Sequence, residues 1–161
     1  MKTHLLLFFI FLFISNSCSS RKYHQHTEVY GIKDVLKKAI LAVCNDADGR
    51  VLRSAKDKPI VIVAFTREDN ICYVYIIPVP FVNKAKVKGN VLINDKLVAF
   101  YYEDSTCILG LIDLNKMKVK YSLDKYIDES DYLKNSSYDA EGLKFRITSA
   151  GKLKLVHKGM F

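Results

Sequence analysis

The strongest feature of the chain is an unbroken apolar run near its start. Residues 5–14 read LLLFFIFLFI and follow Lys2. A membrane-spanning helix needs about 20 apolar residues, and a buried amphipathic helix has a polar face, so this run fits neither. A cationic start followed by a short apolar core is typical of a secretory signal. We therefore predict that residues 1–17 are a signal peptide that exports the protein.

The next pattern is helical and covers residues 32–46. Its apolar positions recur at the three- and four-residue spacing that places them on one face of a helix. They are Ile32, Val35, Leu36, Ala39, Ile40, Val43 and Ala47. Lys33, Lys37 and Lys38 point away from that face, and the polar segment 45–49 ends the helix. The pattern predicts one amphipathic helix at the start of the folded domain.

From Pro59 onward the chain reads as strands and turns. The predicted strands are residues 59–65, 71–77, 87–93, 97–102, 107–114, 117–121, 143–148 and 152–157, with an acidic helix or loop over 124–141. The apolar run at 59–65 suits a central strand covered on both faces, and residues 67–70 and 94–95 read as turns. Short turns between successive strands favour antiparallel pairing. The predicted fold class is α+β, with one N-terminal amphipathic helix packed on a mainly antiparallel meander sheet of about 6–8 strands.

Three regions follow from these patterns. Residues 1–17 form the signal peptide, residues 18–30 a polar tether, and residues 31–161 a single α+β domain. The tether reads CSSRKYHQHTEVY and has no apolar period. The domain that follows has the length of an ordinary single folding unit.

The end of the signal carries a cysteine between small polar residues, SNSCSS at positions 15–20. This cysteine, directly after a short apolar region and a small residue, is similar to the lipobox of bacterial lipoproteins, a likeness confined to residues 1–18. The resemblance implies cleavage before Cys18 and acylation of the new terminus, which anchors the chain by roughly 0.8 kcal/mol per buried methylene. We expect an outer-membrane lipoprotein of the cell envelope. The alternative is cleavage by ordinary signal peptidase, which gives a periplasmic or secreted protein.

Charge changes the choice of partner. The chain carries a formal charge of +8, and removal of residues 1–17 takes away Lys2 and no acid, which leaves +7. A basic protein in the cytoplasm often binds nucleic acid, but export removes that partner. We expect no nucleic acid, a membrane contact through the acyl chains, and a protein or anionic surface as the partner. The pattern gives no indication of the oligomeric state.

With Cys18 acylated, the domain keeps three cysteines, which are Cys44, Cys72 and Cys107. Cys44 falls on the apolar helix face and Cys72 alternates with Val74, which is typical of buried structural thiols. A disulfide from Cys44 to either of the other two is the alternative. No pair has the spacing of metal ligands, so we expect neither a metal nor a cofactor.

Four segments carry basic residues at every second position. They are Lys84, Lys86 and Lys88; Lys116, Lys118 and Lys120; Lys144 and Arg146; and Lys152 and Lys154. Alternate residues of a strand share a face, so neighbouring strands of this kind form one positive sheet face. We predict that these ten residues are the binding site for the partner. The alternative is a soluble outer face on which lysines protect strand edges from aggregation.

The sequence shows no catalytic motif: a G-x-S-x-G elbow, a P-loop and a dinucleotide fingerprint are all missing from it. Its ten tyrosines suit a contact surface. We predict a non-catalytic, lipid-anchored envelope protein that binds a protein or anionic partner, of which an immunity or inhibitor-type lipoprotein is one form. One alternative is a small exported cysteine hydrolase or peptidase that uses Cys107 and His157. Another is a structural subunit of an envelope or surface assembly.

Overall fold

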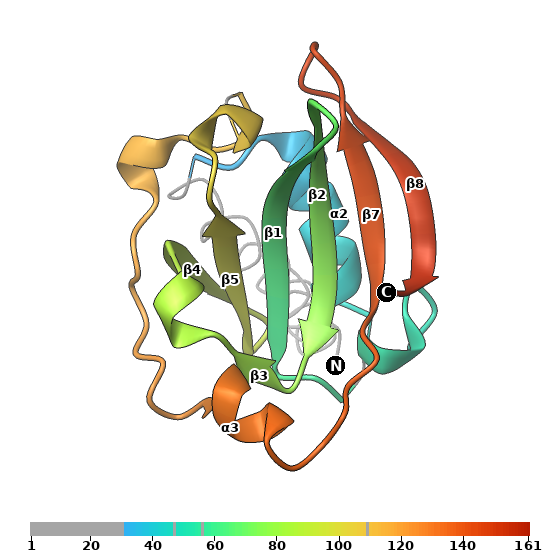
Figure 1. Cartoon of the computed structure of the whole chain (residues 1–161). Coiled ribbons are helices and arrows are strands. Elements are labelled where there is room, and N and C mark those ends of the chain that lie inside the picture. The colour runs from blue at the N-terminus through green and yellow to red at the C-terminus, as the bar shows by residue number, and fades with distance from the viewer. Residues whose placement is uncertain (1–30, 47, 56, 109) are drawn as a thin grey trace, which may run out of the picture.

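The computed structural model describes residues 31–161, apart from residues 47, 56 and 109 (Figure 1). The predicted signal peptide, the Cys18 anchor and the tether all fall in residues 1–30, outside the described residues. Within the described part of the chain, no helix is both long and apolar enough to cross a bilayer.

A six-stranded sheet forms the centre of the domain, in the order β4-β5-β1-β2-β7-β8 (Figure 1). The strands are β1 (Ile60–Glu68), β2 (Ile71–Val79), β4 (Gly89–Ile93), β5 (Lys96–Tyr102), β7 (Glu141–Ile147) and β8 (Leu153–Met160). Every neighbouring pair is antiparallel except β1 and β5, which run parallel. The predicted α+β class with a mainly antiparallel sheet is confirmed.

The strand order differs from the predicted meander at β1. Residues 60–65 of this strand, IVIVAF, are almost all buried, so it needs cover on both faces and hydrogen-bonded neighbours on both edges. β2 fills one edge through the β1–β2 hairpin, and β5 fills the other by pairing Ile60 with Leu97. The β4–β5 hairpin therefore adds beside β1, and β7 takes the remaining edge of β2.

Two tight hairpins use residue pairs with left-handed backbone. Asp69 and Asn70 have φ of 47° and 62°, and Asn94 and Asp95 have φ of 49° and 62°. Asn and Asp tolerate this region better than other residues with a side chain, and two in succession make the turn whose twist matches the flanking strands. Both turns lie where the sequence predicts them.

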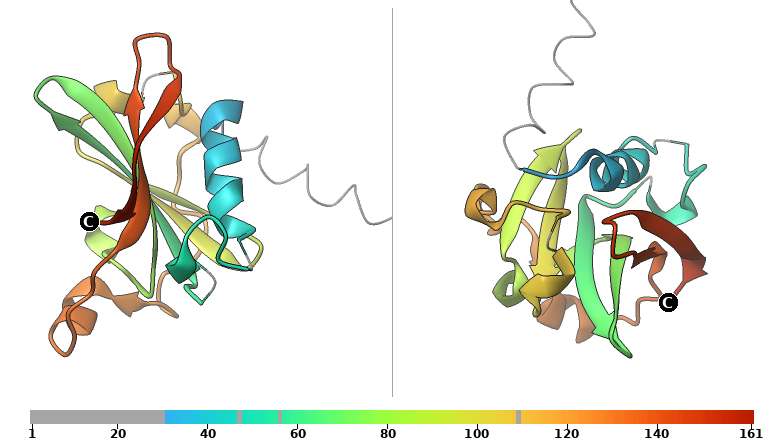
Figure 2. Two further views of the ribbon diagram at one scale, coloured as in Figure 1. Left: turned by 90° about the vertical axis from the view of Figure 1, so that its right-hand side faces the viewer. Right: turned by 90° about the horizontal axis from the view of Figure 1, so that it is seen from above.

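Helix α2 (Asp34–Cys44) lies on one side of the sheet (Figure 2). Leu36, Ile40 and Val43 are buried on it and share one apolar cluster with residues of β1 and β2. The predicted helical segment, residues 32–46, contains α2. The prediction that this is the N-terminal helix of the domain depends on residues 1–30 as well, and they lie outside the described residues.

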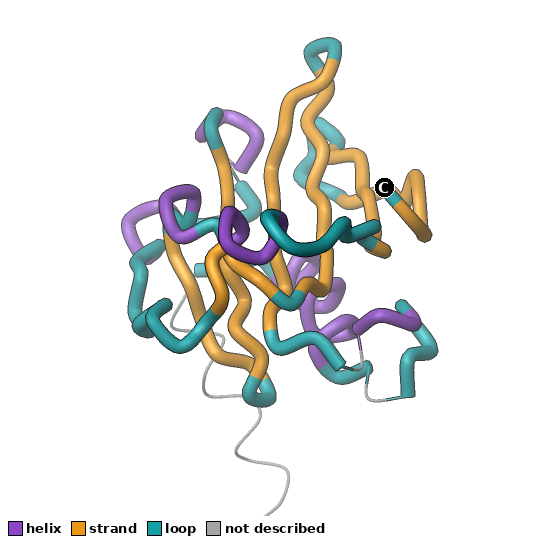
Figure 3. Tube along the Cα trace, turned by 60° about the horizontal axis from the view of Figure 1, so that its bottom comes forward, coloured by secondary structure: helices purple, strands orange, loops and turns teal. Residues whose placement is uncertain are grey.

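The opposite side of the sheet is covered over only part of its area. β3 (Phe81–Val82) and β6 (Ile127–Asp128) pair in parallel there, and α3 (Glu129–Leu133) follows β6. Figure 3 shows α3 and the loop after it crossing this end of the sheet. They close a second apolar cluster whose sheet residues include Ile60, Ile62, Val79, Leu97 and Ala99. Nearer the β1–β2 turn, the described residues provide no such cover.

The predicted strand over residues 107–114 is wrong. This segment begins in the 3₁₀ helix η4 (Ser105–Ile108), and residues 110–113 form a loop with one isolated bridge from Ile112 to Ile32. Leu111 and Ile112 of the loop are buried in the cluster beneath α2. The apolar run therefore fills the core from a loop, and a short apolar run does not by itself distinguish that from a buried strand.

The predicted strand over residues 117–121 is also wrong. It follows the 3₁₀ helix η5 (Leu114–Lys116) and runs beside β4 without strand geometry. Buried Asn90 holds it there: its side-chain oxygen accepts from the backbone N–H groups of Lys120 and Tyr121, at 2.8 and 2.9 Å, and its amide donates to the Tyr121 carbonyl at 2.9 Å. The Asn90 side chain thus holds this segment beside β4 in place of a ladder of backbone hydrogen bonds.

Candidate functional site

The uncovered part of the sheet, on the side opposite α2, is named here the open face. It is formed by Ala64 and Thr66 of β1, Tyr73 and Tyr75 of β2, and Lys144 and Arg146 of β7. The pairing register aligns these six residues in two rows across the three strands, and aligned residues point to the same side. Ala64 also packs against the second apolar cluster, which fixes that side as the one opposite α2.

A polar cluster occupies the centre of the open face. Lys144 Nζ lies 2.7 Å from Glu68 Oε2, and the Tyr75 hydroxyl donates to Glu68 Oε1 at 2.5 Å. The same ammonium lies 4.3 Å from the ring centroid of Tyr73 and 4.9 Å from that of Tyr75. A carboxylate and two aromatic rings therefore hold the lysine at once.

These contacts shift the acid–base properties of the polar groups. Hydrogen bonds from Lys144 and Tyr75 lower the pKa of the Glu68 carboxyl. The hydrogen bond to Glu68 raises the pKa of Lys144. Burial, reinforced by the hydrogen bond to Glu68, raises the pKa of Tyr75. Glu68 compensates the positive charge of Lys144. Lys144 therefore holds the tyrosines of the open face in place and is not available to pair with a partner's acid.

Phe161, the last residue of the sequence, folds back onto the same side of the sheet. Its ring meets that of Tyr75 edge-on, with centroids 5.2 Å apart, and its backbone N–H donates to the Ala140 carbonyl at 2.8 Å. Gly142 makes this approach possible, because a Cβ there would lie 2.8 Å from the Phe161 ring. The open face is thus bordered by an aromatic pair on its β7–β8 side.

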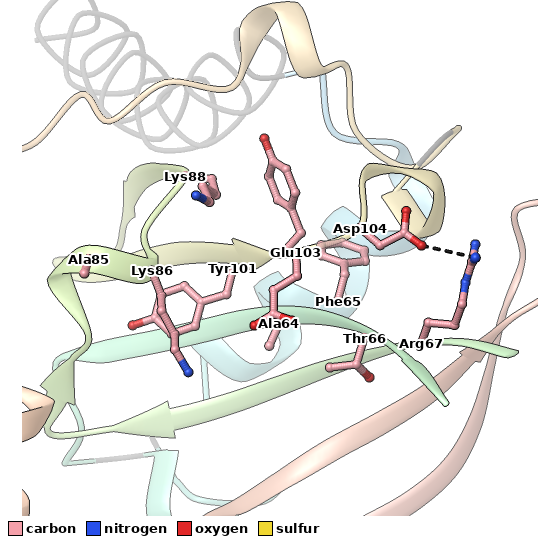
Figure 4. A pocket seen from close by; sticks show the side chains of 11 residues that line it. Ala64, Phe65, Thr66, Arg67, Ala85, Lys86, Lys88, Tyr101, Glu103 and Asp104 are labelled. Atoms are coloured by element: carbon pink, nitrogen blue, oxygen red, sulfur yellow. Dashed lines mark ion pairs between the residues drawn. The ribbon is translucent and has the colours of Figure 1, made fainter. Parts of the chain in front are cut away.

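A groove of about 880 Å³ borders the open face on its β5 side (Figure 4). The residues that line it include Ala64, Thr66, Tyr101, Lys86 and Lys88. The Tyr101 hydroxyl accepts a hydrogen bond from the backbone N–H of Asn83 at 2.8 Å, and burial raises its pKa. Tyr101 therefore forms a fixed wall that stays uncharged at neutral pH.

The groove carries charges of both signs. Lys86 and Lys88 lie at one end, and Arg67 and Asp104 form an ion pair of 3.2 Å at the other (Figure 4). The exposed carboxylate of Glu103 lies between them (Figure 4). Arg67 and Asp104 compensate each other, whereas both lysines are exposed and make no ion pair with another described residue. The available positive charge is therefore at the lysine end.

The cysteines pair in a way that the sequence does not predict. Cys72 of β2 and Cys107 of η4 form a disulfide, with Cα atoms 5.3 Å apart. Cys44 is free and buried on α2, where burial raises the pKa of its thiol to about 12. The expectation of three buried thiols is wrong for Cys72 and Cys107, and the alternative bridge from Cys44 is wrong as well. The helix turns Cys44 into the core, whereas β2 carries Cys72 to η4.

The ten predicted binding residues divide into two groups. One group lies beside β4 and consists of Lys84, Lys86, Lys88, Lys116, Lys118 and Lys120; the other lies on or next to β7 and β8 and consists of Lys144, Arg146, Lys152 and Lys154. The sheet order separates the groups by β5, β1 and β2, and the first group lies outside the strands, with Lys84 and Lys86 in the 3₁₀ helix η3 (Lys84–Lys86). The predicted single positive sheet face is therefore wrong, because its segments are not neighbouring strands.

Members of both groups nevertheless reach the open face, from opposite sides. Lys86 and Lys88 line the groove next to Ala64. Arg146 belongs to the open face, and Lys154 lies directly opposite it in the β7–β8 pairing. Arg146 and Lys154 are exposed and make no ion pair with another described residue. The open face therefore has exposed cations at both rims.

The residues suggested for cysteine chemistry are not brought together as a dyad. Cys107 is bonded to Cys72, so the oxidised protein has no thiolate at that position. The His157 ring instead lies 3.0 Å from the Met160 carbonyl oxygen and packs against Phe161. Among the described residues, no three His, Cys, Asp or Glu side chains gather as metal ligands would.

Comparisons with protein family models, with curated proteins and with solved structures find no match. The candidate site therefore rests on geometry. The alternation of Tyr73 and Tyr75 in the sequence places them on one face of a strand, but the residues that complete the site come from far along the chain. Glu68 and Lys144, its central ion pair, are 76 positions apart, and spacing alone does not reveal that contact.

Proposed function

We propose that this chain is a non-catalytic, lipid-anchored protein of the cell envelope that binds an acidic protein partner through the open face. The observation that carries the proposal is the open face itself: two half-buried tyrosines held around Lys144, with exposed cations at both rims. Aromatic and arginine side chains are enriched at protein interfaces, where tyrosine adds contact area with a polar tip. Cationic rims speed the encounter with an acidic surface and select against basic ones.

The distribution of charge favours a shaped protein surface over a flat anionic membrane. The exposed cations, Lys86, Lys88, Arg146 and Lys154, are divided by the tyrosines, and Glu103 places a carboxylate within the groove. A lipid surface attracts the sum of nearby charges, whereas a protein partner can match each charge in place. Mixed charge around an aromatic centre therefore suits a protein.

The envelope location in this proposal rests on the sequence of residues 1–30. The short apolar run and Cys18 give export and an acyl anchor, and the polar tether separates the anchor from the domain. In the mature protein α2 is then the N-terminal helix, packed on the sheet. The Cys72–Cys107 disulfide supports this location, since disulfides persist in oxidising compartments. An immunity or inhibitor-type lipoprotein works in this way, by occupying its partner's surface.

The test of the open face is a pair of charge-matched variants used as bait in native envelope extract. Lys86→Glu with Arg146→Glu changes both rims, and Lys33→Glu with Lys38→Glu makes the same change in charge at exposed positions beside α2. We expect the wild type and the α2-side variant to retain an acidic protein that the open-face variant loses. Equal retention by all three baits, or loss with both variants, contradicts the proposal.

The anchor has its own test, which is mass spectrometry of the native N-terminus. We expect the mature chain to begin at Cys18 and to carry acyl chains there. An intact Met1, or an unmodified terminus at Ser19 or Ser20, contradicts it. Because the bait assay does not depend on acylation, the two parts of the proposal fail separately.

A further inference from the structure

The two edges of the sheet are treated differently. At β4, the backbone N–H of Asn90 donates to the Lys118 carbonyl at 3.0 Å, and the Asn90 side chain binds the segment around Tyr121, so that edge is covered. β8 is the last strand at the other edge, and no described segment pairs with its outer side (Figures 1 and 2). An unpaired edge presents a row of N–H and C=O groups that can pair with another chain.

Apolar side chains accompany this free edge. Leu155, Val156, Met160 and Phe161 are 51%, 47%, 57% and 45% exposed, and they make up half of the large hydrophobic residues that are exposed in the described part of the chain. Leu155 shares the α2 side of the sheet with Phe145, whereas Phe161 lies beside Tyr75 on the open-face side. Exposed apolar surface therefore flanks the unpaired backbone of this edge from both faces of the sheet.

Charge identifies the occupant. Residues 142–161 contain five cations and no acid. A second copy that paired antiparallel about Lys154, or about Lys158, would place two lysines directly opposite each other, and like charges directly opposite are destabilising. An extended segment with acids at those two positions forms attractive cross-strand pairs instead. The lysines of β8 thus disfavour pairing between two copies of this chain, while an extended acidic segment can still pair with the strand.

We propose that β8 takes up an extended acidic segment of the partner protein as a seventh strand of the sheet. This inference rests on the proposed function and names how the partner's chain docks. Backbone hydrogen bonds to the outer side of β8 hold the segment, and carboxylates opposite Lys154 and Lys158 set its register.

The β7–β8 pairing shifts between Lys144 and Phe145, so the regular stretches of β8 that offer an edge are 153–155 and 157–160. Lys154 lies opposite Arg146 of the open face, and Lys158 lies opposite Leu143, which is buried on the α2 side, so the two lysines point to opposite faces of the sheet. The two carboxylates therefore stand three positions apart in the segment.

The probe is the blocked peptide acetyl-VEVVEVV-amide, whose two glutamates are three positions apart, added to the processed protein purified from its native envelope. Hydrogen–deuterium exchange read by mass spectrometry reports which backbone amides the peptide protects. We expect slower exchange over residues 153–160. Two control peptides are matched in length: one keeps the charges but is N-methylated at every residue, which removes the N–H donors of both edges, and the other has lysine in place of glutamate. Neither is expected to protect β8, because the first cannot form the ladder and the second repels the strand.

A charge swap gives a positive result that a misfolded variant cannot imitate. Lys154→Glu with Lys158→Glu is expected to reverse the preference, so that the lysine peptide protects residues 153–160 and the glutamate peptide binds about tenfold more weakly than to the wild type. Protection by the N-methylated peptide equal to that by its parent would overturn the inference, since charge attraction alone would then explain binding. So would a dimer in which β8 is protected without any peptide.

The outcomes separate this inference from the proposed function. If the glutamate peptide protects β1 and β2 but not residues 153–160, the edge inference is overturned while binding at the open face remains. If the peptide protects nothing while the envelope partner is still lost with Lys86→Glu and Arg146→Glu, the edge inference again falls alone. Protection of β8 together with unchanged envelope capture by that variant supports the edge and contradicts the open face.

Discussion

Removal of the Cys72–Cys107 disulfide gives the largest change in stability that we predict for a single bond. The two cysteines are 35 positions apart. In the chain-entropy description, closing a loop of that length lowers the entropy of the unfolded chain by about 13 cal/mol/K, or about 3.8 kcal/mol at 25 °C. A domain of this size loses about 2 kcal/mol of stability per molar urea. Reduction is therefore expected to lower the urea midpoint by about 2 M.

The assay is urea unfolding of the wild type with and without dithiothreitol, alongside Cys72→Ala with Cys107→Ala. The variant is expected to match the reduced wild type and to be insensitive to dithiothreitol, because Cys44 is not bonded. Alkylation of the unfolded, unreduced domain should label Cys44 and leave Cys72 and Cys107 unlabelled. A change of less than about 1 kcal/mol on reduction, well below the chain-entropy value, would refute the loop-closure reasoning. Labelling of Cys72 or Cys107 would refute the pairing itself.

Three further predictions concern single side chains. Asn90→Ala is expected to lower the free energy of unfolding by about 2–3 kcal/mol, because it strands backbone groups of Lys120 and Tyr121; a loss below about 0.5 kcal/mol in urea unfolding contradicts the role given to this amide. Tyr126→Phe should raise stability by about 1 kcal/mol, since the buried Tyr126 hydroxyl has no hydrogen-bond partner among the described residues; a clear loss in the same assay would show that it has one. Glu68→Gln should cost under about 1 kcal/mol at pH 7, because the Glu68 side chain is 44% exposed. Its pKa lies below the ordinary 4.5, so the stabilisation is present above pH 4.5 and is lost as the pH falls through the lowered pKa; a wild-type advantage that persists undiminished at pH 2 contradicts the ion pair.

Local features of the fold could be predicted from the sequence. The apolar spacing of residues 32–46 located α2, and the Asp-Asn and Asn-Asp pairs located two hairpin turns. The run IVIVAF indicated a strand covered on both faces, which β1 is. These predictions succeed because side-chain period and left-handed turn residues act within a few positions of one another.

Contacts between distant segments could not be predicted in the same way. The parallel pairing of β1 with β5, the β2–β7 pairing and the Cys72–Cys107 bond each join parts of the chain that no local pattern connects. The same limit explains the single positive face that the sequence predicts, since period-two lysines reveal which face a strand presents but not which strand lies next to it. The hydrogen bonds from the Asn90 side chain to residues 120 and 121 could not be predicted either, because one buried amide inside an apolar run carries no periodic signal.

Photo-crosslinking from the open face in living cells tests most directly whether this face binds an acidic partner. Tyr73 has exposed area on that face, and replacing it with p-benzoylphenylalanine puts the crosslinker next to the proposed partner. The same replacement at Lys38, exposed on α2, is the control. We expect a specific adduct with an acidic envelope protein from position 73 and none from position 38. Adducts from both positions, or from position 38 alone, would contradict it.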